Sequence, residues 1–574
     1  MQNSEFIKSL IQIVGSGDVL TEDSQTERYR NGWRSGGGEA EVVVRPLSLL
    51  SLWKVLKECV ENNRIVIMQA ANTGLTEGSA PNGSYDRPVV VINTLKLDRF
   101  HLVREGRQVI SLPGGTLYKL EDALKPLKRQ PHSVIGSSCI GASIMGGVCN
   151  NSGGALIQRG PVYTELSLFA QRRADGSLVL VNHLGIDLGD TPEQILTRLD
   201  AGDFSDADIR DDAGKASDSG YSEKVRDIDS ATPARYNADK ECLHEASGCA
   251  GKLAVFAVRL DTFPVEPETR VFYIGTNETA QLTQLRRRML KELEVLPISG
   301  EYLHREIFDI SHRYGKDTVL MISMLGTKFL PLFFDWKGRL DATFSRWQFT
   351  PDNLVDRVMQ GISRICPELL PRRMLTFREK YEHHLILKVD GSVAKKTESI
   401  LFDTVGEQGY FMCDDKEASK AMLHRFAAAG AAVRYEVLNE KKVEGIIALD
   451  IALRRNDEQW FETLPDSISS QIVSSLYYGH FFCHVFHQDY VVKKGANMPA
   501  LKAQMLAILS DRGAEYPAEH NVGHLYEAKP DLANFYESLD PTNTFNPGIG
   551  KTSKQQRLPK EPAELLPEQV NEPV

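Results

Sequence analysis

The chain has 574 residues, of which 42% are hydrophobic and 25% are charged, and its formal net charge is −10. This is the composition of an ordinary globular protein, and it excludes a wholly disordered chain, a collagen and a small disulfide-stabilised protein. A chain of this length is expected to form several domains, and its acidic balance disfavours nucleic acid as a partner.

The sequence gives no sign of a membrane span or a disulfide framework. No apolar run approaches the ~18 residues that a spanning helix needs, and the first residues lack the pattern of a signal peptide. The eight cysteines are scattered without a CxxC pair, which favours reduced thiols in a cytosolic environment.

Strand-like and helix-like runs alternate in the first part of the chain. Apolar runs at 41–45, 65–68, 88–92 and 108–112 predict buried strands. Ser48 is a candidate N-cap for a helix whose apolar positions recur at helical spacing up to Val60, and a second helix is expected near 116–127. This alternation indicates an α+β protein.

Charge is unevenly distributed along the rest of the chain. Residues 200–229 hold ten acidic and four basic residues, which predicts an exposed, mobile insertion. Residues 305–380 carry a net charge of +4 and residues 419–442 a net charge of +3. Basic regions in an acidic protein suit either a solvated face or a surface that meets anionic lipid. The last 24 residues include four prolines, and we expect a flexible tail from about 551 to 574.

Two glycine-rich stretches are the main signals of a ligand site. The first, at 68–79, follows a predicted strand and reads MQAANTGLTEGS. Such a turn exposes backbone N–H groups that suit a pyrophosphate, although an ordinary tight turn is the alternative. The second, at 136–154, has side chains too small to fill a core and suits backbone laid against a flat, polar ligand. Neither stretch has the spacing of a Rossmann motif.

These stretches resemble the FAD-binding domain of the vanillyl-alcohol-oxidase type. Residues 248–256, GCAGKLAVF, are similar to the third glycine motif of that family, and residues 540–548, DPTNTFNPG, to the closing motif of its D-2-hydroxyacid branch. The resemblance implies that FAD is held by the following residues: Ala70, Ala71, Asn72, Thr73, Gly74, Gly78, Ser79, Gly136, Ser143, Gly153 and Val255. No His or Cys lies between 70 and 79, so we expect FAD to be bound non-covalently.

A narrower resemblance covers nearly the whole chain. Segments 75–79, 131–136, 381–385, 425–432 and 517–524 together resemble the bacterial respiratory, quinone-dependent D-lactate dehydrogenases. This implies D-lactate and a membrane quinone as partners, and a peripheral location on the cytoplasmic face of the inner membrane. The alternative is a soluble flavin dehydrogenase or oxidase that acts on another D-2-hydroxy acid.

The same resemblance implies three domains. We expect a vanillyl-alcohol-oxidase/p-cresol-methylhydroxylase-type FAD-binding domain at 1–262 and 515–574, and a cap domain over the flavin at 263–304, 381–418 and 443–514. A discontinuous basic region at 305–380 and 419–442 would meet an anionic phospholipid surface. Possible headgroup contacts are the following: Arg286, Arg287, Arg288, Arg339, Arg346, Arg372, Arg373, Arg378 and Lys380.

Histidines gather near the C-terminus, where five of the 14 lie between 480 and 524. Oxidation of a 2-hydroxy acid needs a base, and histidine suits that role because its pKa lies near working pH. We expect His520 and the neighbouring Glu519 in the substrate site, together with His480 and His487. Adjacent His383 and His384 would face opposite sides of a strand, so at most one is expected to point inward.

The sequence leaves two questions about the site open: whether it holds a metal, and which cation meets the substrate carboxylate. Related D-lactate dehydrogenases carry a metal on a similar His-x6-His plus Glu pattern, but residues 481–486 are bulky here, so no metal is expected and a divalent ion is the alternative. For the cation that meets the substrate carboxylate, four residues are candidates: Arg425, Arg434, Lys493 and Lys494.

Overall fold

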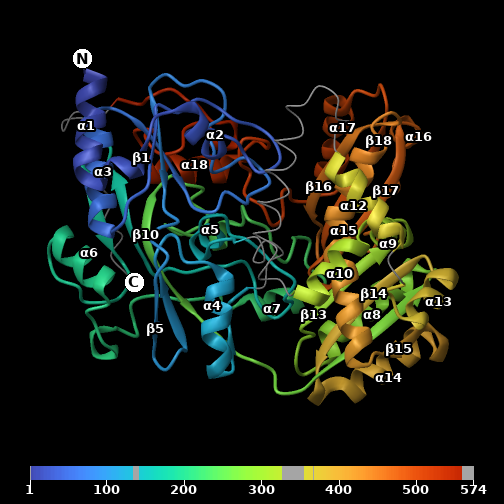
Figure 1. Ribbon diagram of the computed structural model, residues 1–574. Helices are drawn as coiled ribbons and strands as arrows, with labels where there is room; N and C mark the ends of the chain where they lie inside the picture. Colours follow the sequence, from blue (N-terminus) through green and yellow to red (C-terminus); the bar gives the residue numbers. More distant parts are fainter. Residues whose placement is uncertain (1, 134–140, 326–353, 366–367, 559–574) are drawn as a thin grey trace.

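A computed structural model describes residues 2–133, 141–325, 354–365 and 368–558. Its elements form two halves, which lie side by side in Figure 1. The first half holds the four-stranded and five-stranded sheets and both ends of the described chain, and the second holds one large sheet flanked by helices. None of the described helices is long and apolar enough to cross a membrane.

The first sheet of the N-terminal half is mainly parallel. Its order is β1 (Val19–Leu20), β2 (Val42–Val44), β4 (Val89–Asn93) and β3 (Ile65–Gln69), with β1 antiparallel to β2. Nearly every residue of β2, β3 and β4 is buried, which explains their continuous apolar runs. Helix α3 (Leu49–Glu61) makes the crossover, and Ser48 is its N-cap, as the sequence predicted; with Ser51 it also forms a capping box.

The second sheet of this half is antiparallel. Its order is β5 (Phe100–Val103), β6 (Gln108–Ser111), β10 (Ala254–Asp261), β8 (Ser167–Arg172) and β9 (Leu178–Asn182). Helices α4 (Leu117–Leu124) and α5 (Ile144–Cys149) pack on it and share one apolar cluster with β8 and β10.

The C-terminal segment returns to the N-terminal half. Helix α18 (Pro530–Leu539, red) lies among its elements in Figure 1. Beyond it, Phe545 forms a parallel bridge with Val66 of β3, and Val66 N–H donates to Thr544 O at 3.0 Å. The segment therefore adds a short strand-like edge beside β3.

The second half is built on a seven-stranded antiparallel sheet (Figure 1). Its order is β15 (Tyr410–Met412), β12 (Thr269–Thr276), β14 (His383–Asp390), β13 (Ser299–His304), β17 (Ile472–His480), β18 (Val485–Lys493) and β16 (Val443–Ala452). Helices α8 (Thr279–Glu292), α14 (Ala394–Val405) and α17 (Met498–Asp511) cover one face. Helices α9 (Arg305–Tyr314), α13 (Arg372–Lys380) and α15 (Asp415–Leu438) cover the other.

Seven further α-helices lie in the described part of the chain. Their bounds are α1 (Gln2–Val14), α2 (Asp23–Arg30), α6 (Pro192–Ala201), α7 (Tyr221–Arg226), α10 (Lys316–Leu325), α12 (Leu354–Ile365) and α16 (Asp466–Ser469). Short strands β7 (Arg129–Gln130) and β11 (Phe263–Pro264) pair with each other.

Three expectations from the sequence are wrong. Residues 200–229 are not an exposed insertion throughout: most of 201–215 is exposed or half-buried, but Tyr221, Val225 and Ile228 are almost fully buried in the core of the second half. Their apolar side chains recur at helical spacing, and this outweighs the acidic composition. Arg286 is buried as well and donates to Phe482 O and Arg455 O, so it cannot meet a lipid headgroup. His383 and His384 are both buried, because helices cover both faces of their sheet.

Candidate active site

The turn after β3 has the features of an anion-binding nest. Asn72 and Glu77 adopt left-handed backbone conformations, and Asn72 joins the turn to Asn31 O and Ser79 Oγ at 2.8 Å each. No backbone N–H group from 71 to 79 donates to an acceptor in the part of the chain that the structure describes. A Cβ placed on Gly74 would meet no atom within 4 Å, so free space adjoins the turn. These features fit a diphosphate that accepts hydrogen bonds from the backbone.

The second glycine-rich stretch contains helix α5. Ser143 caps α5, with its Oγ accepting from Gly146 N at 2.9 Å, so its side chain serves the helix. Gly153 follows α5, and Gly136 lies outside the described residues. Val255 lies in β10 opposite Phe169 of β8, and its side chain is buried in the core there.

A single side chain links three of the motifs that the sequence separates. Asn546 Nδ2 donates to Gly78 O and to Ala250 O, at 2.8 Å each. The closing motif therefore holds the first and third glycine motifs together. Gly523 also touches the first motif, because its own backbone lies against Thr76 O.

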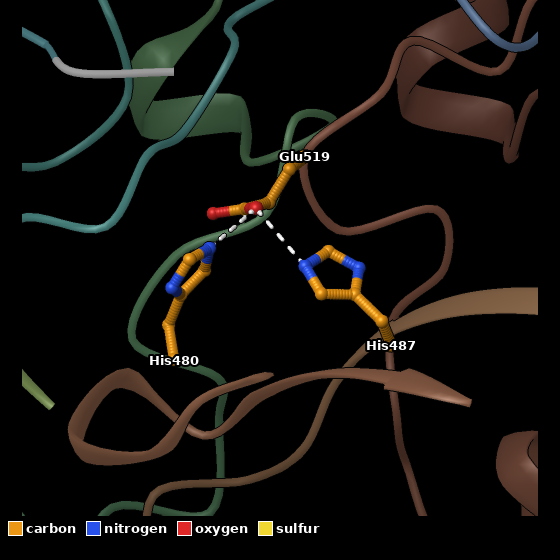
Figure 2. A group of neighbouring side chains, drawn as sticks. All are labelled: His480, His487 and Glu519. Atoms are coloured by element: carbon orange, nitrogen blue, oxygen red, sulfur yellow. Dashed lines mark ion pairs between the residues drawn. The ribbon is translucent and has the colours of Figure 1, made fainter. Parts of the chain in front are cut away.

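The predicted catalytic residues come from three chain segments that meet at the large sheet. His480 ends β17, His487 lies in β18, and Glu519 follows α17. Glu519 Oε2 lies 3.2 Å from His480 Nε2 and 3.9 Å from His487 Nε2 (Figure 2). The structure thus brings together all three residues of the predicted His-x6-His plus Glu pattern.

The strand register sets a second carboxylate opposite each histidine. Glu301 of β13 is the cross-strand partner of His480, and its Oε1 lies 2.7 Å from His480 Nδ1. Asp450 of β16 is the partner of His487, and its Oδ1 lies 3.5 Å from His487 Nδ1. Each imidazole therefore lies between Glu519 and a carboxylate of a neighbouring strand.

Two buried arginines complete the cluster. Arg235 Nη2 lies 2.6 Å from Glu519 Oε1, and Arg425 Nε of α15 lies 2.9 Å from Glu301 Oε2. Arg235, Glu519, His480, Glu301 and Arg425 thus form one row of alternating charge that runs from the N-terminal half to α15. All five side chains are largely shielded from solvent.

Burial and these contacts shift the pKa values of the row. Burial acts against charged His480, but Glu301 and Glu519 outweigh it and raise the pKa of His480 to about 10. Burial acts against ionised Glu519 too, yet His480 and Arg235 hold the pKa of Glu519 well below its usual range. In contrast, burial holds the pKa of His487 well below that of a free imidazole, despite nearby Glu519.

His520 lies at the open side of the cluster. Its side chain is 35% exposed, and its Nε2 lies 4.0 Å from Asp450 Oδ2. Its backbone carbonyl accepts a hydrogen bond from Asn237 Nδ2. Among the predicted catalytic residues, His520 is therefore the one that a small molecule reaches most readily.

The structure places the four candidates for the carboxylate-binding cation in different surroundings. Arg425 lies at the cluster, where Glu301 already pairs with it. Arg434 pairs with Asp317 in the helical layer, Lys493 donates to Ser470 O, and Lys494 pairs with Glu444. Arg425 is thus the candidate that the fold brings to the site.

Sequence reasoning missed Glu301, Asp450, Arg235 and Asn237. Asp450 interrupts an apolar strand that reads GIIALDIA, and a lone charge in such a strand is a usable signal of a paired, buried site. Arg235 and Asn237 lie in irregular chain between α7 and β10, where no periodicity marks them. Only the fold shows their partners.

A divalent cation fits the central atoms of the cluster. His480, His487 and Glu519 each offer a ligand atom, and these atoms lie within 4.8 Å of one another. Carboxylates on the far nitrogen of both imidazoles are the arrangement that orients metal-bound histidines. The donor set of two imidazoles and one carboxylate suits several divalent metals.

Comparison with known proteins adds the family. A sequence model described as "D-lactate dehydrogenase, membrane binding" matches residues 271–558, and one described as "FAD binding domain" matches residues 40–167. The quinone-dependent D-lactate dehydrogenase of Escherichia coli (strain K12) is 59% identical over 556 residues, covering 96% of this chain and 97% of that protein. The enzyme of the same description from Haemophilus influenzae is 56% identical, covering 97% and 99%.

Solved structures agree on the fold. The 4-ethylphenol oxidase of Gulosibacter chungangensis superposes with a TM-score of 0.57 at 11% identity, covering 96% of this chain and 97% of that one. The p-cresol methylhydroxylase superposes with a TM-score of 0.56 at 12% identity and the same coverage. The predicted fold class is confirmed. The chain belongs to the family of quinone-dependent D-lactate dehydrogenases, with an FAD-binding domain in its N-terminal part and the membrane-binding region of the family in its C-terminal half.

Proposed function

We propose that this protein oxidises D-lactate to pyruvate on bound FAD and passes the electrons to a membrane quinone. The observation that carries this proposal is the contact between the ionisable cluster and the FAD motifs. A Cβ on Gly153, at the end of the second motif, would lie 2.4 Å from Glu519 Oε1. The groups that hold and deprotonate a hydroxy acid thus adjoin the place where the flavin is expected.

FAD supplies the acceptor for the hydride that leaves C2 of the substrate. The unpaired N–H groups of 71–79 support binding of its diphosphate, and the glycine-rich backbone of the second motif supports the ring. We expect non-covalent binding, because this turn contains no His or Cys.

His520 is the proposed base for the substrate hydroxyl. Its Nε2 lies 4.0 Å from Asp450 Oδ2, and a neutral imidazole offers one ring nitrogen that can accept the hydroxyl proton. The partial exposure of the ring allows the proton to pass on to solvent afterwards. Glu519, His480 and His487 form the adjoining wall and orient the hydroxyl group.

A divalent ion at His480, His487 and Glu519 would polarise the substrate hydroxyl as a Lewis acid. The sequence led us to expect a metal-free site, and the donor geometry supports the alternative. Elemental analysis of the purified protein decides between them.

The basic region at 305–380 and 419–442 is the proposed contact with anionic phospholipid at the cytoplasmic face. In its described part, α15 exposes Phe426 and Val433, while Lys441 and Lys442 are exposed just beyond this helix. Exposed apolar side chains and lysines within one stretch of the chain suit a surface that lies on a bilayer. Of the other proposed headgroup contacts, Arg339 and Arg346 lie outside the described residues, and Arg373 and Arg378 pair with Glu417 and Asp309.

The test of the proposed function is anaerobic bleaching of the bound flavin. We expect D-lactate to bleach it faster than L-lactate, glycolate or D-2-hydroxyglutarate, and a quinone to reoxidise it faster than oxygen does. Rapid bleaching by another hydroxy acid, or reoxidation by oxygen alone, would instead support a soluble enzyme for a different substrate.

His520→Ala tests the proposed base. Removing a general base typically costs 10²–10⁴-fold in rate, so we expect single-turnover flavin reduction to slow by that order while FAD stays bound. His183→Ala is the control, because His183 is exposed and pairs with Glu245 on the N-terminal half. A reduction rate equal to that of the parent protein would remove His520 from the mechanism.

A further inference from the structure

The carboxylate of Glu519 is held on one side by an arginine that no motif predicts. Arg235 is 2% exposed and lies in irregular chain between α7 and β10. Its Nη2 donates to Glu519 Oε1 at 2.6 Å and also to Gly154 O. Its Nη1 donates to Leu156 O at 3.1 Å. One guanidinium therefore joins Glu519 to the backbone that follows the second FAD motif.

Gly153 forms the other side of the same site. A Cβ on Gly153 would lie 2.4 Å from Oε1, 3.1 Å from Cδ and 3.2 Å from Cγ of Glu519. Distances under 3.0 Å essentially never occur for real Cβ atoms, so any larger residue would displace the carboxylate. Close approach of Glu519 therefore accounts for a glycine here.

These contacts fix which oxygen of Glu519 meets the histidines. Oε1 is occupied by Arg235, and Oε2 lies toward His480 at 3.2 Å and His487 at 3.9 Å. An unpaired buried carboxylate could rotate or take up a proton, whereas a charge-assisted hydrogen bond to arginine gives it one orientation.

We propose that Arg235 and Gly153 form the seat of Glu519, and that Arg235 is a positioning residue for oxidation of the hydroxy acid. The seat ties the carboxylate to the loop that follows the second FAD motif, so it sets the distance between the substrate-holding wall and the flavin. This inference rests on the proposed function.

Two variants test the seat from opposite sides. Arg235→Lys keeps the charge but cannot bridge two carbonyls and a carboxylate, and Gly153→Ala keeps Arg235 but pushes the carboxylate away. A misplacement of about 1 Å can cost on the order of 10²-fold, so we expect single-turnover flavin reduction by D-lactate to fall by that order in both. FAD content and KM are expected to change much less.

Arg259→Lys is the matched control. Arg259 is as buried as Arg235 and donates to Leu184 O and Arg210 O, away from the site. Its substitution is expected to lower thermal stability and leave flavin reduction near the parent rate. Comparing the two variants separates loss of a buried guanidinium from loss of the seat.

A double variant distinguishes a positioning role of Arg235 from a purely structural one, because it shows whether two rate losses multiply. If Arg235 acts through Glu519, the losses in Arg235→Lys and Glu519→Gln do not multiply when combined.

Three outcomes would contradict the proposed role of the seat. The first is flavin reduction at the parent rate in Gly153→Ala with FAD bound, and the second is rate losses that multiply in the double variant. The third is a rate loss in Arg259→Lys equal to that in Arg235→Lys. If Arg235→Lys does not fold, Gly153→Ala and Glu519→Asp, which withdraws the carboxylate by one methylene, decide the question. A parent protein that D-lactate fails to bleach would reject the proposed function instead.

Discussion

Gly74 and Gly153 are both glycines of the predicted FAD motifs, yet the structure gives them different surroundings. Gly74 adjoins free space at a turn with unpaired N–H groups, whereas the space beside Gly153 is filled by Glu519. A glycine can therefore be needed for a ligand at one position and for a neighbouring side chain at another. The residue type alone does not distinguish the two.

Gly74→Val is expected to abolish FAD retention, because the isopropyl group would enter the space proposed for the diphosphate. The ratio of flavin to protein absorbance after gel filtration measures this. Gly17→Val is the control. Gly17 is exposed, a Cβ placed on it also meets no atom within 4 Å, and the residue is far from the FAD motifs in the sequence. Full retention of FAD in Gly74→Val would contradict the placement of the diphosphate.

At the scale of elements, the site depends on contacts between loops and turns from distant parts of the chain, and not on a single helix or strand. The turn after β3 is held by the loop before α18 and by the segment after it. Gly523 N-terminal to α18 has a φ of +54°, and a Cβ there would lie 1.8 Å from Thr76 O. His524 N donates to the same carbonyl at 2.9 Å. A side chain at 523 would thus separate the two segments.

Gly523→Ala is expected to lower both the unfolding temperature and FAD affinity. A left-handed backbone costs a non-glycine residue roughly 1–2 kcal/mol, and the clash with Thr76 adds to this. Gly495→Ala is the matched control, because Gly495 has a φ of +85° but open space at its Cβ. Thermal unfolding with and without added FAD measures both effects. Equal losses in the two variants would show that Gly523 acts through its own conformation alone.

At the scale of the whole molecule, an acidic protein presents a basic, partly apolar region on its second half. Lys441 and Lys442 are exposed just beyond α15, whereas Lys54 and Lys57 are exposed on α3, at the far side of the first half in Figure 1. Lysines near an anionic bilayer contribute about 1 kcal/mol each, and salt screens them within a Debye length of about 10 Å at 0.1 M.

The double variant Lys441→Gln/Lys442→Gln is expected to weaken binding to vesicles with anionic lipid by roughly 30-fold, which corresponds to about 2 kcal/mol. Lys54→Gln/Lys57→Gln should bind as the parent does, although it loses the same charge. Sedimentation with vesicles at several salt concentrations gives the comparison. Equal weakening in both variants, or binding that ignores salt, would argue against docking through this region.

Local patterns were enough for much of the first half. The N-cap at Ser48, the buried strands up to 112 and the histidine spacing were readable because each depends on residues close together in the sequence. Composition was a poorer guide, since ten acidic residues at 200–229 predicted an exposed insertion, whereas three apolar side chains fold residues 221–228 into the core. Within one segment, acidic side chains can stay in water while apolar side chains are buried, so acidic composition alone does not predict exposure.

The sequence by itself determined the family, the glycine motifs and the three residues His480, His487 and Glu519, because those signals are carried by residue types at short spacing. Only the tertiary structure decided that Glu301 and Asp450 face the histidines and that Arg235 reaches Glu519 across 284 positions. Such pairs follow from strand register and from the packing of distant segments, which no local pattern encodes. The charges stay buried only because each finds its partner there.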